Sequence, residues 1–321
     1  MTMLRMSGIR KCFGTRQVLD GLSLSVARGE VYGLLGPNGC GKSTAINILC
    51  NLLDADAGSA EIAGEAVSKR TQHRIGACPQ EIALYKDLRA PENLDFFARL
   101  YGLSAADRQR RVAELVELFK LGPHVGTRVA QLSGGWQQRV NIAAAVVHAP
   151  DVLILDEPTS AVDVDARHEL WELIEGLKRG GMTTLLTTHH LDEAERLCTR
   201  VGIMRDGRIA AEGSLSELLA RVPAKAVALV ETRDEPAARQ RAGELGWATR
   251  TYAGKLGCLL ARQVSLREIV NAFDGIDVSA VSVQPVTLEH AYLEVLHGAP
   301  RIEAARGQAT ELQGSRQGAP T

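Results

Sequence analysis

The residues best suited to chemistry form one stretch of nine: Gly36-Pro37-Asn38-Gly39-Cys40-Gly41-Lys42-Ser43-Thr44. Its three glycines let backbone N–H groups turn towards phosphate oxygens. Lys42 adds a positive charge for the β- and γ-phosphates, and the Ser43 hydroxyl can ligate Mg²⁺. The apolar run Val31–Leu35 precedes the stretch and helical apolar spacing follows it, so a helix directs its positive end at the anion. The pattern predicts a nucleotide site; the alternative is a chance match in a glycine-rich turn.

A second glycine-rich segment, residues 132–139, reads Leu-Ser-Gly-Gly-Trp-Gln-Gln-Arg and begins another expected helix. Ser133 is placed to act as the N-cap of this helix. Gly134 and Gly135 expose backbone N–H groups at its positive end. The segment predicts a second anion site, with a simple helix cap and turn as the alternative.

A pair of carboxylates follows the apolar run of residues 152–155, which is typical of a parallel strand covered on both faces. Open α/β sheets bind ligands at the carboxyl ends of such strands. Asp156 can hold Mg²⁺ through water, and Glu157 can polarise an attacking water. Two surface acids at a strand end are the alternative interpretation.

Three further polar residues follow expected strands. His189 and His190 come after Thr183–Thr188, where one imidazole could contact a γ-phosphate; two surface histidines are the alternative. Gln80 follows a strand end and Pro79, a pattern that by itself indicates only a hinge loop.

The six cysteines are scattered without a Cys-x-x-Cys pair, which indicates reduced thiols and neither a disulfide framework nor a zinc site. Cys40 is notable because it lies two residues before Lys42. It could be a small loop filler, or its alkylation could block nucleotide binding.

The composition describes a folded globular chain of 321 residues, with 45% hydrophobic and 23% charged residues. A formal net charge of −1 gives no electrostatic case for binding nucleic acid or anionic lipid. Neither an apolar run of the roughly 18 residues that span a membrane nor a secretion signal is expected, so a role at a membrane requires a partner.

The elements around these motifs follow in order. Residues 1–30 predict an antiparallel sheet with a turn at Phe13-Gly14-Thr15, where the Phe13 ring either packs in the core or stacks on an adenine base. A mostly helical insert is expected at about 81–131, since apolar residues there recur at helical spacing. Residues 201–213 predict a hairpin.

The pattern restarts beyond residue 221. Residues 222–297 predict the order β-α-β-β-α-β followed by a helix, which suggests a small ferredoxin-like module. Residues 298–321 have little to bury, and a disordered tail is expected there.

In combination, these motifs resemble the ATP-binding subunit of ABC transporters over residues 1–220. The resemblance implies an α/β fold: a P-loop ATPase domain, at 1–221, with a mixed sheet and a helical subdomain, followed by a small C-terminal α+β module. It assigns the phosphate loop to residues 36–44, the hinge glutamine to Gln80 and the signature to residues 132–137. Cys40 and Trp136 occupy variable positions of the family pattern.

The resemblance also implies roles for individual residues. Asp156 matches the magnesium-site aspartate, Glu157 the catalytic glutamate and His189 the switch histidine; Ser43 and Gln80 join the magnesium site, and Gln80 also serves catalysis. Residues 160–163 match the D-loop, and Phe13 stands where the base-stacking residue is more usually tyrosine. The implied nucleotide-binding residues are Phe13, Gly36, Asn38, Gly39, Cys40, Gly41, Lys42, Ser43, Thr44, Ser133, Gly134, Gly135, Gln137 and Asp163.

The partners follow from the same resemblance. It implies a head-to-tail dimer in which each ATP lies between the phosphate loop of one copy and the signature of the other. A separate membrane-spanning permease contacts the helical insert and Gln80, which places the chain in the cytoplasm, peripheral to the inner face of the membrane. No nucleic-acid partner is expected.

Residues 83–85 and 97–103, together with residues 285–289, are most similar to the exporter branch, which includes drug-resistance, sodium and lipid or polysaccharide exporters. The expected function is ATP hydrolysis that powers export. An importer ATPase and a soluble ABC ATPase acting on ribosomes or DNA are the alternatives. The cargo is not encoded here, because cargo contacts belong to the permease.

Overall fold

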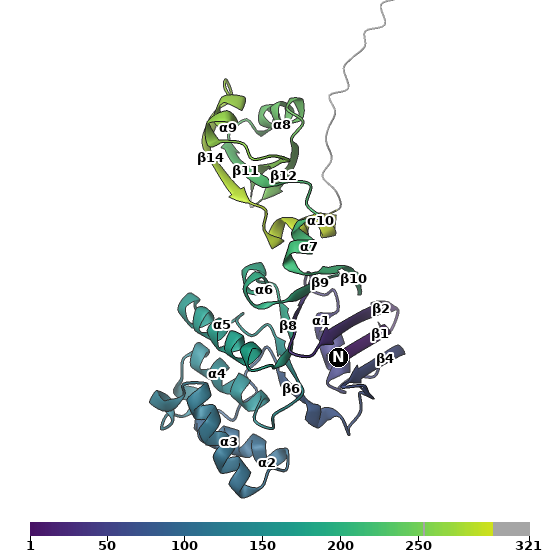
Figure 1. The fold of residues 1–321 in the computed structure, drawn as a ribbon, viewed down its shortest axis with the longest axis vertical. Helices are drawn as coiled ribbons and strands as arrows, with labels where there is room; N and C mark the ends of the chain where they lie inside the picture. The colour runs from purple at the N-terminus through teal and green to yellow at the C-terminus, as the bar shows by residue number, and fades with distance from the viewer. Residues whose placement is uncertain (253, 298–321) are drawn as a thin grey trace, which may run out of the picture. The chain divides into compact units, whose positions relative to one another are not determined.

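A computed structural model describes residues 1–252 and 254–297 of the chain (Figure 1). The described residues form two compact units, the first comprising Met1–Arg221 with Ala291–Leu296, and the second comprising Val222–His290 with His297. The sequence analysis placed all of 222–297 in the second domain, whereas this division gives Ala291–Leu296 to the first unit. The tail expected at 298–321 lies outside the described residues.

The first unit is built on a six-stranded sheet with the order β10-β9-β3-β8-β7-β6. In chain order its strands are β3 (Val31–Leu35), β6 (Ile75–Cys78), β7 (Val152–Asp156), β8 (Thr183–Thr188), β9 (Arg200–Arg205) and β10 (Arg208–Gly213). β10 pairs antiparallel with β9, while the other neighbouring strands run parallel. The mixed sheet of the expected ATPase domain is therefore confirmed.

Both faces of this sheet are buried, which explains the continuous apolar run in β7. Leu153 and Leu155 pack with α4 (Gly134–Ala145) and α5 (Val164–Arg179) on one face. Val152 and Ile154 point to the other face and join a second cluster there.

This second cluster is built from α1 (Lys42–Leu49) and an antiparallel sheet. The sheet has the order β2-β1-β4-β5, and its strands are β1 (Thr2–Phe13), β2 (Arg16–Ala27), β4 (Ala57–Ile62) and β5 (Glu65–Ala66). The turn between β1 and β2 falls at the predicted position. Figure 1 shows β1, β2 and β4 on one side of the first unit and the helices α2 to α5 on the other.

The helical insert lies between β6 and β7, as predicted. It contains α2 (Ala90–Leu100), α3 (Ala105–Leu118) and the short 3₁₀ turns Gly122–His124 and Val129–Gln131; another such turn, Gln72–Arg74, precedes β6. Leu94, Leu115 and Phe119 are buried and join the cluster beneath α4 and α5. Two short helices, α6 (Leu191–Leu197) and α7 (Leu215–Leu219), complete the unit.

The second unit has the elements that the sequence predicts. Its elements are β11 (Ala226–Thr232), α8 (Glu235–Glu244), β12 (Ala248–Tyr252), β13 (Lys255–Leu260), α9 (Leu266–Ala272), β14 (Val278–Pro285) and the start of α10 (Leu288–His297). The antiparallel order β12-β13-β11-β14 is the ferredoxin-like arrangement of a β-α-β-β-α-β chain. Across the part of the chain that the structure describes, no helix is long and apolar enough to cross a membrane.

Gly76 shows how closely β6 packs on α4. A Cβ atom at this position would lie 2.1 Å from the backbone oxygen of Ala145, which cannot move without shifting the helix end. We predict that Gly76→Ala lowers the free energy of unfolding by about 1–3 kcal/mol, the usual cost of overpacking. Urea unfolding followed by circular dichroism checks this. Gly122→Ala is the matched control, because a Cβ at Gly122 meets nothing within 4 Å; equal losses in the two variants would contradict the packing argument.

Candidate nucleotide-binding and hydrolysis site

The order of the parallel strands gathers the predicted site residues at one edge of the sheet. β8 lies between β3 and β7, and β6 is the outer neighbour of β7. The segments that leave the carboxyl ends of these strands therefore lie in a row: the phosphate loop after β3, His189 after β8, Glu157 after β7 and Gln80 after β6. This is the edge at which open α/β sheets bind ligands.

The phosphate loop has a backbone that its glycines make possible. Gly39 and Gly41 have φ angles of +79° and +110°, in the left-handed region that side chains rarely adopt. A Cβ at Gly36 would lie 2.6 Å from both the Cys40 sulfur and the Met204 backbone oxygen. The Lys42 Nζ donates to the Gly36 carbonyl at 2.8 Å, so the loop wraps closely around this ammonium group.

A magnesium ion would be held between α1 and β7. Ser43 is exposed in the first turn of α1. Asp156 accepts a hydrogen bond from the Thr187 hydroxyl. Burial is the main cause that raises the pKa of Asp156, and this hydrogen bond and, less strongly, Lys42 oppose the rise. No group of three or more His, Cys, Asp or Glu side chains suited to a metal occurs within the described chain. One hydroxyl and one carboxylate fit Mg²⁺, which commonly takes its other ligands from water and substrate phosphates.

Glu157 is the centre of a polar cluster. Its Oε2 lies 3.1 Å from His189 Nδ1 and 3.3 Å from Gln80 Nε2. Its backbone is left-handed at φ +47°, and its N–H donates to the Thr187 carbonyl at 3.0 Å. The structure thus brings together three of the predicted residues from three different strand ends, with Glu157 largely buried and His189 half exposed.

The signature segment lies elsewhere on the first unit, at the start of α4. Ser133 is the N-cap residue, as predicted, but its side chain makes no capping bond, and Gln137 Nε2 donates to the Leu132 carbonyl at 2.9 Å. A Cβ at Gly134 would lie 3.3 Å from the Ala161 backbone oxygen, so the segment borders the D-loop. Among the residues described, no hydrogen bond or ion pair joins it to residues 36–44.

The D-loop residue Asp163 has a visible local role. It is the N-cap of α5, and its carboxylate accepts from the Ala166 N–H at 2.8 Å.

Phe13 is exposed, at 51% of its surface, and is not a core residue. The Lys11 ammonium lies 5.8 Å from the centre of its ring. Arg16, on the other side of the same turn, would lie 3.7 Å from a Cβ at Gly39. The β1–β2 turn is therefore beside the phosphate loop, which favours the base-stacking interpretation of Phe13 over the core one.

Two contributors were missed by the sequence analysis, namely Thr187 and Arg16. Thr187 contacts both Asp156 and Glu157, and its position one residue before the end of a strand next to β7 was the available signal. Arg16 was detectable only as a basic residue directly after the Phe13-Gly14-Thr15 turn.

A glycine-rich loop between strand and helix, with carboxylates at the end of a nearby parallel strand, defines a P-loop ATPase. The family model described as "ABC transporter" matches residues 19–160. The linearmycin resistance ATP-binding protein LnrL of Bacillus subtilis is 40% identical over 223 residues, 68% of this chain and 72% of that one. The daunorubicin resistance ATP-binding protein DrrA3 of Streptomyces coeruleorubidus is 36% identical over 320 residues, 95% of this chain and 99% of that one.

Solved structures agree with these sequence matches. An ATP-binding subunit of an ABC transporter superposes with a TM-score of 0.62 at 32% identity, covering 68% of this chain and 92% of the other. A dimeric ATP-binding cassette in a post-hydrolysis state with ADP and Pi gives a TM-score of 0.59 at 27% identity, covering 66% and 98%. The chain belongs to the ABC transporter ATP-binding family. The resemblance and the fold class inferred from the sequence are thereby confirmed, and the chain is an ATPase.

Cys40 lacks the exposure and the thiolate character of a reactive thiol, which was one of the two hypotheses for this residue. Only 7% of the residue is exposed, and burial raises the pKa of its thiol, so little of the nucleophilic thiolate forms near neutral pH.

We predict that a maleimide at pH 7 labels the exposed Cys12 well before Cys40, whether or not ATP is present. Peptide mass mapping over a time course checks the order. Fast labelling of Cys40 that ATP prevents would instead support the hypothesis that alkylation blocks the nucleotide site.

Proposed function

We propose that this chain is the ATP-hydrolysing subunit of an exporter, which dimerises head-to-tail around two ATP and powers transport through a separate permease. The observation that carries the hydrolytic part is the convergence of Gln80, Glu157 and His189 next to the phosphate loop and Asp156.

The phosphates of ATP would bind the loop and the start of α1. The backbone N–H groups of residues 36–44, except Pro37, would face the phosphate oxygens, and Lys42 would offset part of the charge of the β- and γ-phosphates. Ser43, Asp156 and Gln80 would hold Mg²⁺, which offsets the negative charge of the phosphates. Phe13 would stack on the adenine from the β1–β2 turn.

Glu157 is placed to act as the general base. It accepts a proton from a water whose oxygen forms the new bond to the γ-phosphorus, while the bond between that phosphorus and the bridging oxygen of ADP breaks. His189, at hydrogen-bond distance from Glu157, would steady the transferred phosphoryl group, and Gln80 would orient the water.

A second copy would complete each site. Ser133, Gly134, Gly135 and Gln137 would bind the γ-phosphate held by the other copy, with Asp163 close by. The exposed Ser133 side chain, which makes no capping bond in its own helix, supports this role. Solved cassettes of the family form dimers, so a self-dimer is a property of this type of domain.

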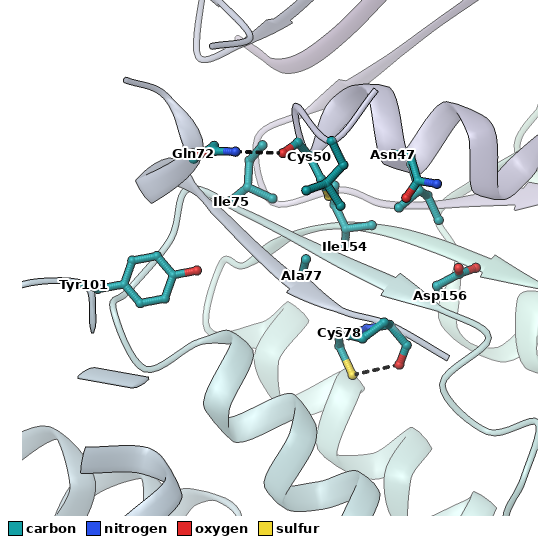
Figure 2. Close-up of a pocket in the computed structure, with 12 residues that line it drawn as sticks. Asn47, Cys50, Gln72, Ile75, Ala77, Cys78, Tyr101, Ile154 and Asp156 are labelled. Atoms are coloured by element: carbon teal, nitrogen blue, oxygen red, sulfur yellow. Dashed lines mark hydrogen bonds between the residues drawn. The ribbon is translucent and has the colours of Figure 1, made fainter. Parts of the chain in front are cut away.

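The permease would dock beside the helical insert. Leu52 and Leu100 are apolar but 73% and 65% exposed, and Tyr101 is 41% exposed. Leu52 and Tyr101 border a cavity of about 420 Å³ that extends to Asp156, and Figure 2 shows Tyr101 and Asp156 at opposite ends. An apolar side chain of the permease inserted here would lie between the membrane partner and the magnesium site.

Export is favoured by the names of the relatives. Besides the two resistance proteins, a Nod factor export ATP-binding protein I of Paraburkholderia xenovorans is 44% identical over 215 residues, 66% of this chain and 71% of that one. The chain would then act in the cytoplasm, held at the inner face of the membrane by its permease. An importer remains the second candidate, since the ATPase site is the same in both.

We predict that Glu157→Gln keeps ATP binding but lowers turnover about 10²–10⁴-fold, the usual contribution of a general base. Phosphate release and nucleotide binding, measured on the same preparation, check the two halves of this statement. Asp192→Asn, a nearby exposed acid outside the cluster, is the matched control and should hydrolyse ATP normally. Near-normal turnover of the Glu157 variant would remove it from the proposed role.

We also predict that Leu52→Glu abolishes recovery of a membrane protein with the tagged chain from gently solubilised native membranes, while ATP hydrolysis by the isolated chain persists. A charge on this apolar surface would have to be desolvated on docking. Leu118→Glu is the control, because Leu118 is also exposed but lies on α3 and does not line the cavity. Recovery of ribosomes, or of a soluble dimer alone, with the unmodified chain would contradict the transport function.

A further inference from the structure

One charged side chain of the first unit is completely buried and has no role in the site described so far. Glu193 lies in the first turn of α6 and is 0% exposed. A buried carboxylate is costly unless hydrogen bonds compensate for the lost water, so its partners define what it does.

The partners of Glu193 come from separate segments. The Thr159 hydroxyl donates to Oε1 at 2.8 Å, and the Trp171 indole N–H, from α5, donates to the same oxygen at 3.0 Å. Burial raises the pKa of Glu193, and its hydrogen bonds oppose that rise. The other carboxylate oxygen, Oε2, is buried and has no hydrogen-bond partner among the described residues.

Thr159 and the helix that carries Glu193 both adjoin the catalytic cluster. Thr159 stands two residues after Glu157 in the turn that follows β7, and α6 begins two residues after His189. The next residue of the turn, Ser160, donates its hydroxyl hydrogen to the Glu157 carbonyl at 3.0 Å. One carboxyl group therefore connects the turn that carries Glu157 with the helix that follows His189.

The turn needs such support because Glu157 has a left-handed backbone, a conformation that a non-glycine residue keeps only when its surroundings hold it. A leucine in place of Glu193 could fill the same space without burying a charge. What an apolar residue could not do is accept hydrogen bonds from Thr159 and Trp171.

We propose that Glu193 is a positioning residue that fixes the distance between Glu157 and His189 by tying the turn at Thr159 to α6, the helix that begins two residues after His189. The inference rests on the roles proposed above for Glu157 and His189. The proposal predicts that replacing Glu193 slows the chemical step of hydrolysis. Nucleotide binding should be unchanged, because the phosphate loop follows a different strand, β3.

The experiment compares two replacements of similar size in the full chain. Glu193→Gln keeps an oxygen that accepts from Thr159 and Trp171, whereas Glu193→Met keeps the volume and loses the acceptor. We expect Glu193→Met to lower kcat for ATP about 10–100-fold with a KM within about 2-fold, because small misplacements of catalytic groups cost this much. Glu193→Gln should retain kcat within about 5-fold.

Leu197→Ala is the control for a purely structural effect, since Leu197 is buried in the same helix and has no part in the hydrogen bonds. It should lower the thermal midpoint while leaving kcat at the permissive temperature close to that of the unmodified chain. If Glu193→Met does not fold, Thr159→Val removes the same hydrogen bond from the other end and should give the same loss of kcat.

Three outcomes would overturn the proposal: unchanged kcat in Glu193→Met or its Thr159→Val substitute, equal losses in the Gln and Met variants, or a loss of kcat in Leu197→Ala as large as that in Glu193→Met. These are distinct from a failure of the proposed function, which would show as normal turnover of Glu157→Gln.

Discussion

The hydrogen bond from the Glu157 N–H to the Thr187 carbonyl is the interaction on which the site depends. It continues the pairing of β7 and β8 one residue beyond the sheet and holds Glu157 in a left-handed turn. The Thr187 hydroxyl contacts Asp156 from the same strand end. The proposed magnesium ligand and the proposed general base are therefore positioned by one residue of the neighbouring strand, and neither carboxylate could move without disturbing the other.

The sheet tolerates this polar edge because its two faces are apolar. Leu153 and Leu155 bury one face of β7 under α4 and α5, while Val152 and Ile154 bury the other against α1 and the antiparallel sheet. Water is thus excluded along the strand, and the polar groups concentrate where the strands end. Burial there raises the pKa of Asp156, and the Thr187 hydrogen bond and, less strongly, Lys42 oppose this rise.

Sequence patterns predicted what depends on local periodicity. Spacing and turn residues were enough to predict the order of helices and strands along the second unit, the helical insert and the turn at Phe13. The contacts of Thr187 and Glu193 were not predicted, because they join residues that are 22 to 34 positions apart in sequence, such as Trp171 or Thr159 with Glu193, and no periodicity records such pairs. The Cys40 thiol was uncertain for the same reason: its burial depends on contacts that spacing does not encode.

The exposure of Lys42, Glu157, Ser133 and Gly134 fits their proposed roles. Lys42 is buried and Glu157 largely so, and in the proposed site both act on the nucleotide of their own chain. Ser133 and Gly134 are exposed at the start of α4, and in the proposed dimer they act on the nucleotide of the other chain. Residues that act on the nucleotide of their own chain can be held in place by the core of that chain. Residues that act on the nucleotide of a second copy must lie at the surface. In the proposed dimer, a γ-phosphate is fully surrounded only when two copies associate. The contact between the two copies therefore also completes the site for hydrolysis.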